Sequence, residues 1–326
     1  MSAIIKQGNK TVYPILFEVN YGQMKSINCY LYHDGQTLTL IDGGFRTEKF
    51  DEYFDLKLAE YGLSIDEIDR ILLTHHHEDH TGQVNRIVER RNIPVYAHHL
   101  ALERLHFDKT YLQKKRDFFM RLYEDYGCTK FASDRLEKMA KTFLESDKYK
   151  LNTEIHPLYG GDSICGMKVI EVPGHSPDSI IFYDEETKWQ FVGDLVLNPG
   201  STNALIDFDE DLNLLPTVAQ YEQSLLKCQA LDASLIFPGH QQPFSNHKIV
   251  IDEKLNRIAT KCERIVEVIK DGHHQALQIA YAMYGPKLQK EFPLVMSEVI
   301  GFLAYAESKQ KISKTMKDGE WYFERV

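Results

Sequence analysis

Cysteine is scarce in this chain, and its few thiols follow no pattern. The 326 residues include Cys29, Cys128, Cys165, Cys228 and Cys262. Their number is odd, and they lack the paired spacing of a zinc ribbon or finger. A disulfide-stapled secreted scaffold and a cysteine-based metal site are therefore not expected. We expect reduced thiols in a cytoplasmic protein.

Long apolar runs and excess positive charge are also missing. No stretch approaches the roughly 20 apolar residues of a membrane-spanning helix, and Met1–Gly8 has no apolar core of a signal peptide. The formal net charge of −10 does not attract nucleic acid or anionic membranes in bulk. We therefore expect a small-molecule substrate, with no membrane and no nucleic acid as partner. The length allows a large core and exceeds one typical domain.

Histidine, in contrast, is concentrated in one short segment. Thr74–Gly82 reads T-H-H-H-E-D-H-T-G directly after an apolar run. On an extended backbone, His75 and His77 point the same way. If the chain then turns into a helix, Asp79 and His80 face back toward the same cavity. Imidazoles and a carboxylate are ligands that zinc accepts. A weak surface metal site is the alternative interpretation of this segment taken alone.

Three further candidate ligands follow later apolar runs. They are His175 after Val169–Val172, Asp194 after Trp189–Val192, and His240 after Leu235–Phe237. Glycine or proline beside each one allows a sharp turn at a strand end. A lone buried histidine is usually a core residue, and a lone Gly-Asp is usually a turn. All of them in this order are not expected by chance. Seven such side chains can hold two metals, with one carboxylate shared.

This ordered set resembles the dinuclear branch of the metallo-β-lactamase-fold hydrolase superfamily, over roughly residues 10 to 250. The T-H-x-H-x-D-H pattern is complete from Thr74 to His80. The resemblance implies two metal sites and a bridge, formed by His75, His77 and His175, by Asp79, His80 and His240, and by Asp194. It also implies that the Asp42 turn, in Ile41–Gly44, supports the metal loop without binding metal.

Some positions depart from the pattern of the family or separate its branches. Glu78 stands where small or apolar residues are common, and Asp178 stands where glycine is common. Neither is a ligand position, so they put the substrate contacts in doubt and leave the metals in place. Asp194 in place of cysteine argues against a classical zinc β-lactamase. His77 argues against the oxygen-reducing di-iron branch, which has glutamate there.

The order of elements predicts an α/β protein. Early strands are expected at 12–19, 26–32 and 37–41, and an amphipathic helix at 50–61 ends before Gly62. Short buried strands at 70–73 and 94–97 surround the metal loop, and a helix precedes the His240 strand. This order fits two mixed sheets with helices outside, the four-layer αβ/βα sandwich that the resemblance implies. We expect a catalytic domain at 1–252 and a C-terminal unit at 253–326.

Residues about 99–150 interrupt the alternation with two amphipathic stripes. One contains Phe118, Phe119, Leu122, Tyr123 and Tyr126, and the other runs from Leu136 to Leu144. These stripes either pack on the main body or form a helical cap over the metal cleft. A cap would supply the apolar walls that substrate pockets usually have. Asn198–Asn203 is either a second edge of the pocket or a surface turn.

The C-terminal segment predicts helices followed by a hairpin. Helices are expected at 253–270, 275–284 and 294–307, and Asp318-Gly319 marks a hairpin turn. This pattern resembles the winged-helix appendage of one branch, some of whose members cleave single-stranded RNA. From 290 to 326, six basic and six acidic residues cancel, whereas RNA binding needs excess positive charge. The unit is therefore interpreted as a packing or dimerisation element, and a homodimer is possible. His273 and His274 are interpreted as turn residues.

The expected chemistry follows from the metals. Two divalent ions, with zinc as the default and manganese or iron accepted, would hold a bridging hydroxide. It would attack a small ester, lactone or thioester, apolar or weakly charged, while Asp79 orients it and carries its proton. No Gly-x-Ser-x-Gly elbow is present, so a serine mechanism is not required. The alternatives are a winged-helix-assisted ribonuclease and a nearly inactive signalling effector on the same fold.

Overall fold

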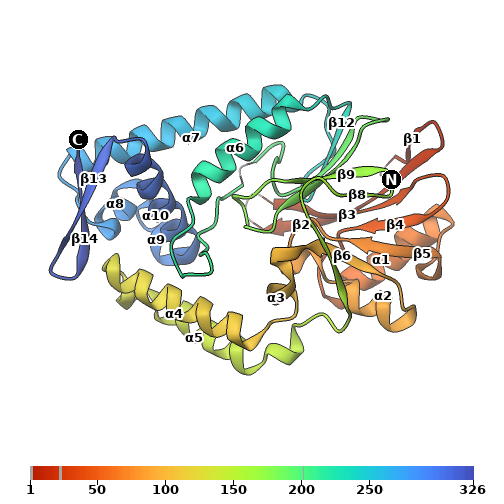
Figure 1. Ribbon diagram of the computed structural model, residues 1–326, viewed down its shortest axis with the longest axis horizontal. Coiled ribbons are helices and arrows are strands. Elements are labelled where there is room, and N and C mark those ends of the chain that lie inside the picture. Colours follow the sequence, from red (N-terminus) through yellow and green to blue (C-terminus); the bar gives the residue numbers. More distant parts are fainter. Residues whose placement is uncertain (1–2, 22–23, 201) are drawn as a thin grey trace.

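The computed structural model in Figure 1 describes residues 3–21, 24–200 and 202–326. The strands are β1 (Ile5–Gln7), β2 (Lys10–Tyr21), β3 (Met24–His33), β4 (Leu38–Ile41), β5 (Ile68–Leu72), β6 (Val95–His98), β7 (Ile155–Leu158), β8 (Ser163–Ile164), β9 (Met167–Glu171), β10 (Ile180–Asp184), β11 (Trp189–Gly193), β12 (Leu235–Pro238), β13 (Ile312–Lys317) and β14 (Glu320–Arg325). The α-helices are α1 (Glu48–Tyr61), α2 (Val84–Arg90), α3 (Leu102–Leu105), α4 (Lys109–Asp125), α5 (Thr129–Leu144), α6 (Thr217–Ala230), α7 (His247–Lys270), α8 (Ala276–Tyr284), α9 (Lys287–Lys290) and α10 (Phe292–Ser308). Short 3-10 turns lie at η1 (Ile65–Glu67), η2 (Glu78–His80), η3 (His99–Ala101) and η4 (Ser146–Lys148).

Two mixed sheets form the centre of the molecule. The seven-stranded sheet has the order β1 to β7, and the five-stranded sheet has the order β12-β11-β10-β9-β8. Strands β4 to β7 pair in parallel, as do β11 and β12, while the other pairs are antiparallel. Parallel neighbours need a crossover connection, and α1, α2 and α6 supply three of them. The carboxyl ends of β4 and β5 therefore lie side by side.

Alternation along each strand divides its side chains between two cores. In β3, Tyr30 and Tyr32 face the other sheet, while Leu31 belongs to the outer core under α1 and α2. In β10, Phe182 faces the first sheet and Ile181 faces the helices on the opposite side. Alternate residues of a strand face opposite sides of the sheet. Because both sets are apolar here, these strands are buried on both sides.

Helices cover the outer face of each sheet and complete four layers. Phe50 and Phe54 of α1 and Val84 of α2 pack on the seven-stranded sheet. Helices α6 and α7 cover the five-stranded sheet (Figure 1), through residues such as Leu225 and Val250. The four-layer αβ/βα sandwich expected from the sequence is confirmed.

The predicted helical insertion consists of α3, α4 and α5. Asp108 accepts a hydrogen bond from the Tyr111 backbone N–H and so caps the first turn of α4. In Figure 1, α4 and α5 extend away from the sheets toward the C-terminal helices. Tyr123 lies 5.5 Å from Phe292 of α10, and Tyr126 lies 6.1 Å from Phe323 of β14, between ring centroids. The insertion therefore packs on the C-terminal segment as well as on the sandwich.

The C-terminal segment shares the core of the five-stranded sheet. Helix α7 begins at His247 and continues past residue 253, where a separate unit is expected. Helices α8 and α10 and the β13–β14 hairpin all contribute side chains to the same buried cluster. Asp318 and Gly319 both have positive φ, 52° and 84°, as a two-residue hairpin turn of type I′ requires. The predicted hairpin is thus present.

Within the described residues, no helix combines the length and the apolar character needed to cross a membrane.

Candidate metal centre

The seven candidate ligands all follow strand ends and lie close together. His75, His77 and the short turn η2, which holds Asp79 and His80, follow β5. The other three are His175 after β9, Asp194 after β11 and His240 after β12.

The turn before Asp194 depends on a glycine. Gly193 has φ +49°, and a Cβ there would lie 2.5 Å from Oγ1 of Thr74, the residue that opens the metal loop. The absence of a side chain lets the ends of β5 and β11 approach each other.

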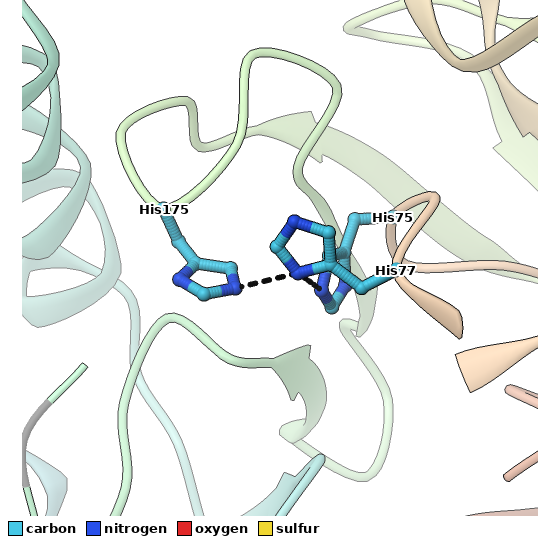
Figure 2. A group of neighbouring side chains, drawn as sticks. All are labelled: His75, His77 and His175. Carbon is cyan, nitrogen blue, oxygen red and sulfur yellow. Dashed lines mark hydrogen bonds between the residues drawn. The ribbon is translucent and has the colours of Figure 1, made fainter. Parts of the chain in front are cut away.

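Three imidazoles form the first ligand group (Figure 2). Nε2 of His75 lies 2.9 Å from Nδ1 of His77, and Nε2 of His175 lies 3.0 Å from the same atom. Burial lowers the pKa of all three rings. Neutral imidazoles have a free lone pair, which a metal requires.

A second group consists of Asp79, His80 and His240, and Asp194 lies between the two groups. Nε2 of His240 is 3.4 Å from Asp79 Oδ2, and Nε2 of His80 is 3.9 Å from Asp79 Oδ1. Asp194 Oδ2 lies 3.5 Å from Nε2 of His175 and 3.3 Å from Nε2 of His240, while its Oδ1 lies 3.5 Å from Nε2 of His80. One carboxylate thus reaches ligands of both groups.

The donor atoms fit divalent metals. Zinc bonds of 2.0–2.2 Å in tetrahedral geometry place two ligand atoms about 3.3 Å apart, close to the spacings around Asp194. Nε2 of His80, Nε2 of His240 and Oδ1 of Asp194 are buried and have no hydrogen-bond partner among the described residues. Buried polar atoms are normally satisfied, so these three are available as metal ligands.

Buried carboxylates make the second ligand group electronegative, so that it stabilises positive charge. Burial alone would lower the pKa of His80 and His240, but Asp42 and Asp194 raise the first, and Asp194 raises the second to about 10. Burial would raise the pKa of Asp194, but His240 and His80 lower it well below its usual range. The anionic carboxylates thus stabilise protons on His80 and His240. Metal cations at the same position would be stabilised by the same negative charge and can replace those protons.

Asp42 supports the metal loop from behind. Its carboxylate accepts hydrogen bonds from the backbone N–H of Thr74 at 2.8 Å, the Thr74 hydroxyl at 2.8 Å and Nδ1 of His80 at 2.9 Å. Since a carboxylate can only accept, Nδ1 of His80 carries a proton, and Nε2 is the nitrogen whose lone pair a metal would use.

Backbone carbonyls orient two further ligands in the same way. Nδ1 of His175 donates to the Asn203 carbonyl at 2.9 Å, and Nδ1 of His240 donates to that of Ser26 at 2.8 Å. Asn203 belongs to the segment expected to be a pocket edge or a surface turn. Here it positions His175 and, with Thr202, borders a separate cavity of about 370 Å³. Ser201 of that segment lies outside the described residues.

Asp178 contacts the metal loop. It is fully buried and accepts from the backbone N–H of His76 at 2.8 Å and from Nδ1 of that ring at 2.7 Å. It therefore ties the loop after β5 to the loop before β10. Glu78, the other departure from the family pattern, lines the adjoining cavity.

Two neighbouring cavities with shared lining residues lie beside the first ligand group. The inner one, about 190 Å³, is lined by His77 and His175 together with residues of α4, α5 and α10. The outer one, about 490 Å³, is lined by His76, His77 and Glu78 and by the insertion and α9–α10. The insertion therefore borders the candidate metal centre.

Sequence reasoning did not assign the basic residues of these cavities. Lys115 and Arg135 line both spaces, and Arg104 lines the outer one. They lie on three different helices and carry no motif, so only the packing of those helices shows that they converge.

His98, His99 and Glu171 form another polar group outside the predicted set. Nε2 of His98 lies 3.1 Å from Oε1 of Glu171, which also accepts from the Gly160 backbone N–H at 2.9 Å. The His99 ring stacks on Tyr159 with 4.6 Å between centroids. These contacts join the ends of β6, β7 and β9.

Comparison with known proteins identifies the family of the chain. The sequence model described as the metallo-beta-lactamase superfamily matches residues 23–240. The probable metallo-hydrolase YqjP of Bacillus subtilis (strain 168) is 27% identical over 295 residues, which cover 90% of this chain and 91% of that protein. An atrochrysone carboxyl ACP thioesterase of Aspergillus fumigatus is 24% identical over 235 residues, 72% of this chain and 57% of the relative.

Solved structures share the fold along nearly the whole chain. A metallo-beta-lactamase family protein from Thermus thermophilus superposes with a TM-score of 0.76 at 21% identity, covering 97% of this chain and 98% of the other. A beta-lactamase domain protein from Burkholderia ambifaria gives 0.73 at 20% identity, covering 99% and 93%. The shared fold therefore includes the helical insertion and the C-terminal segment.

Proposed function

The chain belongs to the metallo-beta-lactamase superfamily and is a metallo-hydrolase, and on that premise we propose that it cleaves a small ester, lactone or thioester with two divalent metals. The observation that carries the proposal is the position of Asp194. Its carboxylate lies 3.5 Å from His175 of one ligand group and 3.3 Å from His240 of the other. A carboxylate in this position can bridge two ions.

The ligand set suits zinc and also accepts manganese or iron. When bound, two such metals supply a hydroxide nucleophile at neutral pH and polarise the carbonyl group of the substrate. Asp42, Asn203 and Ser26 accept hydrogen bonds from Nδ1 of His80, His175 and His240, so that Nε2 of each ring is the nitrogen that a metal would bind. These contacts preorganise the site before metal or substrate arrives.

Asp79 has the role of proton carrier. Its side chain is 20% exposed, whereas those of Asp194 and His240 are 10% and 2% exposed. Burial alone would raise the pKa of Asp79, but the charge of His80 and the hydrogen bond from His240 lower it well below its usual range. Ionised Asp79 can accept a proton from the nucleophile and pass it to the leaving group.

An acyl substrate is supported by a relative and by the cavity. One relative is described as a thioesterase, and cavities of 190 and 490 Å³ accommodate small molecules. The C-terminal hairpin packs through Phe323 against Tyr126 at the end of α4, and its basic and acidic residues balance. That hairpin offers little attraction for the phosphates of RNA.

The test is turnover by metal-loaded full-length protein of p-nitrophenyl esters, lactones, acyl thioesters and single-stranded RNA. At least one carbonyl substrate should be hydrolysed, and Asp79→Ala should reduce kcat/KM at least about 100-fold with an unchanged circular dichroism spectrum. Asp211→Ala, at an exposed site on another loop, is the matched control and should keep full activity. Efficient RNA cleavage that is lost with Asp79→Ala, without hydrolysis of any carbonyl substrate, would overturn the proposal.

A further inference from the structure

We propose that Lys115 of α4 and Arg135 of α5 form a subsite for an anionic group, so that the substrate is an ester or thioester that also carries a carboxylate or a phosphate. This inference rests on the proposed function and names the substrate class of the same site.

The position of the two cations supports the subsite. Lys115 and Arg135 both line the inner cavity, whose other walls include His77 and His175 of the first ligand group. They also line the outer cavity, which opens between the insertion and α9–α10. A substrate whose carbonyl group reaches the metals through these cavities therefore extends past both cations. Because the inner cavity measures only about 190 Å³, the distance from that carbonyl group to the cations is short.

The walls of the two cavities carry more positive than negative charge, as a site for an anionic group requires. Five basic residues line the two spaces, namely Arg104, Lys115, Arg135, Lys138 and Lys290, against the acidic residues Glu78, Asp134 and Asp207. Arg104 and Asp207 neutralise each other through an ion pair of 3.0 Å. This positive excess lies inside a chain whose net charge is −10.

Lys115 and Arg135 are half-buried without an anion of their own. Neither forms an ion pair with any residue that the structure describes. The Arg135 guanidinium lies 4.8 Å from the Phe119 ring centroid, and its buried Nε has no hydrogen-bond partner among the described residues. Burial lowers the pKa of Lys115. The charge of Asp207 opposes this effect in part, whereas the neighbouring charges of Arg135 and Arg104 lower the pKa further. A cation held in this way is stabilised by an incoming anion.

The remaining walls fit an acyl chain. Tyr111, Phe131, Met139 and Phe292 line the outer cavity, and Phe119 and Tyr123 line the inner one. Apolar walls with a few charged groups are typical of a site that binds an apolar chain ending in a charge. The cavity walls thus have the aromatic character expected from the sequence. The two cations add the requirement that the substrate carry a negative charge.

The test uses four thioesters that separate the position of the anion. Pentanoyl and glutaryl groups differ by one terminal carboxylate, and each is attached either to uncharged N-acetylcysteamine or to phosphate-bearing coenzyme A. Metal-loaded wild type should hydrolyse glutaryl-N-acetylcysteamine, or pentanoyl-coenzyme A, with kcat/KM at least about 10-fold above that of pentanoyl-N-acetylcysteamine. The first result assigns a carboxylate to the subsite, and the second assigns a phosphate.

Variants connect this preference with the two cations. Lys115→Met and Arg135→Met should each reduce the ratio between anionic and neutral thioesters about 10-fold. Lys141→Met, on the exposed side of α5, is the matched control and should leave the ratio unchanged. Equal hydrolysis of neutral and anionic thioesters by wild type overturns the subsite, and so does a preference that persists in both variants.

A binding measurement separates this inference from the proposed function. If the protein hydrolyses none of the esters or thioesters, the proposed function is overturned. The subsite is then tested by calorimetric titration of metal-loaded protein. Glutarate should bind wild type at least about 10-fold more tightly than pentanoate, and Lys115→Met or Arg135→Met should remove this difference. For a phosphate subsite, the same comparison is made between propyl phosphate and 1-propanol. Equal affinities in both pairs overturn the subsite.

Discussion

Asp42→Asn removes a buried negative charge behind His80 and keeps the shape of the side chain. The amide oxygen must take the position that accepts from the backbone N–H of Thr74, because the amide NH₂ cannot accept there. The NH₂ then faces Nδ1 of His80, where Asp42 now accepts at 2.9 Å. Nδ1 would have to accept, which moves the ring proton to Nε2 and removes the lone pair that faces Asp79 and Asp194.

The expected loss of metal affinity follows from the loss of one hydrogen-bond partner of His80. Loss of an outer-shell partner typically weakens metal binding 10- to 100-fold, or about 1.4–2.7 kcal/mol. The weakened metal is the one held by Asp79, His80 and His240. The other group is affected less, since Asp42 reaches it only through Thr74, whose Oγ1 lies 3.1 Å from Nδ1 of His75. Loss of a charged, buried hydrogen bond also costs about 1.5–3 kcal/mol of unfolding free energy.

Competitive titration of zinc against chelators of graded affinity measures both sites. Asp42→Asn should keep one tight metal and show a second that is weakened 10- to 100-fold, while Asp211→Asn should match wild type. Two metals of wild-type affinity in Asp42→Asn would refute the tautomer argument. Equal weakening of both metals would refute the assignment of Asp42 to the second group.

Four further outcomes are expected. Gly239→Ala should fold but bind metal at least about 10-fold more weakly, since its Cβ would lie 2.5 Å from Asp194 Oδ1; wild-type metal affinity would contradict the close approach. Phe237→Ala should cost about 3–5 kcal/mol in denaturant unfolding, because the ring is fully buried between the sheets; a loss below 1 kcal/mol would be inconsistent. A disulfide reagent should rapidly titrate Cys165 alone in native protein, because the other four thiols are buried; rapid reaction of two or more would disagree. Burial lowers the pKa of Lys254 from 10.5 to about 8, so at this group the unfolded state binds more protons between these values, and its contribution to stability rises from about pH 8 to 10.5; wild type should therefore gain stability relative to Lys254→Met over this range, and parallel pH profiles would count against the shift.

The sequence predicts the sandwich and the strand ends well because both are local patterns. Apolar runs that end in glycine or proline determine where β9, β11 and β12 stop, and the same turns aim His175, Asp194 and His240 inward. Which of these side chains approach one another depends on sheet order, and here the resemblance to a family supplied what periodicity alone does not contain. The assignment of metals to the seven residues stays a prediction until metal is measured.

Boundaries and long-range contacts were harder to predict. Helix α7 begins at His247, six residues before the expected start at 253, because buried Val250 and Ile251 extend its apolar face over the five-stranded sheet. Lys115 and Arg135 are ordinary helix residues in the sequence, and their approach depends on how α4 packs against α5. The bond between Asp178 and His76 spans 102 positions and has no local signal. The division at 252–253 stays a prediction.

The measurement that tests the central claim most directly is the metal content of full-length protein, by elemental analysis together with anomalous diffraction. Two divalent ions per chain are expected, one among His75, His77 and His175 and the other among Asp79, His80 and His240, with Asp194 between them. His75→Ala and His240→Ala should each reduce the content to about one ion. Fewer than two ions in metal-saturated wild type, or anomalous peaks away from these side chains, would contradict the account.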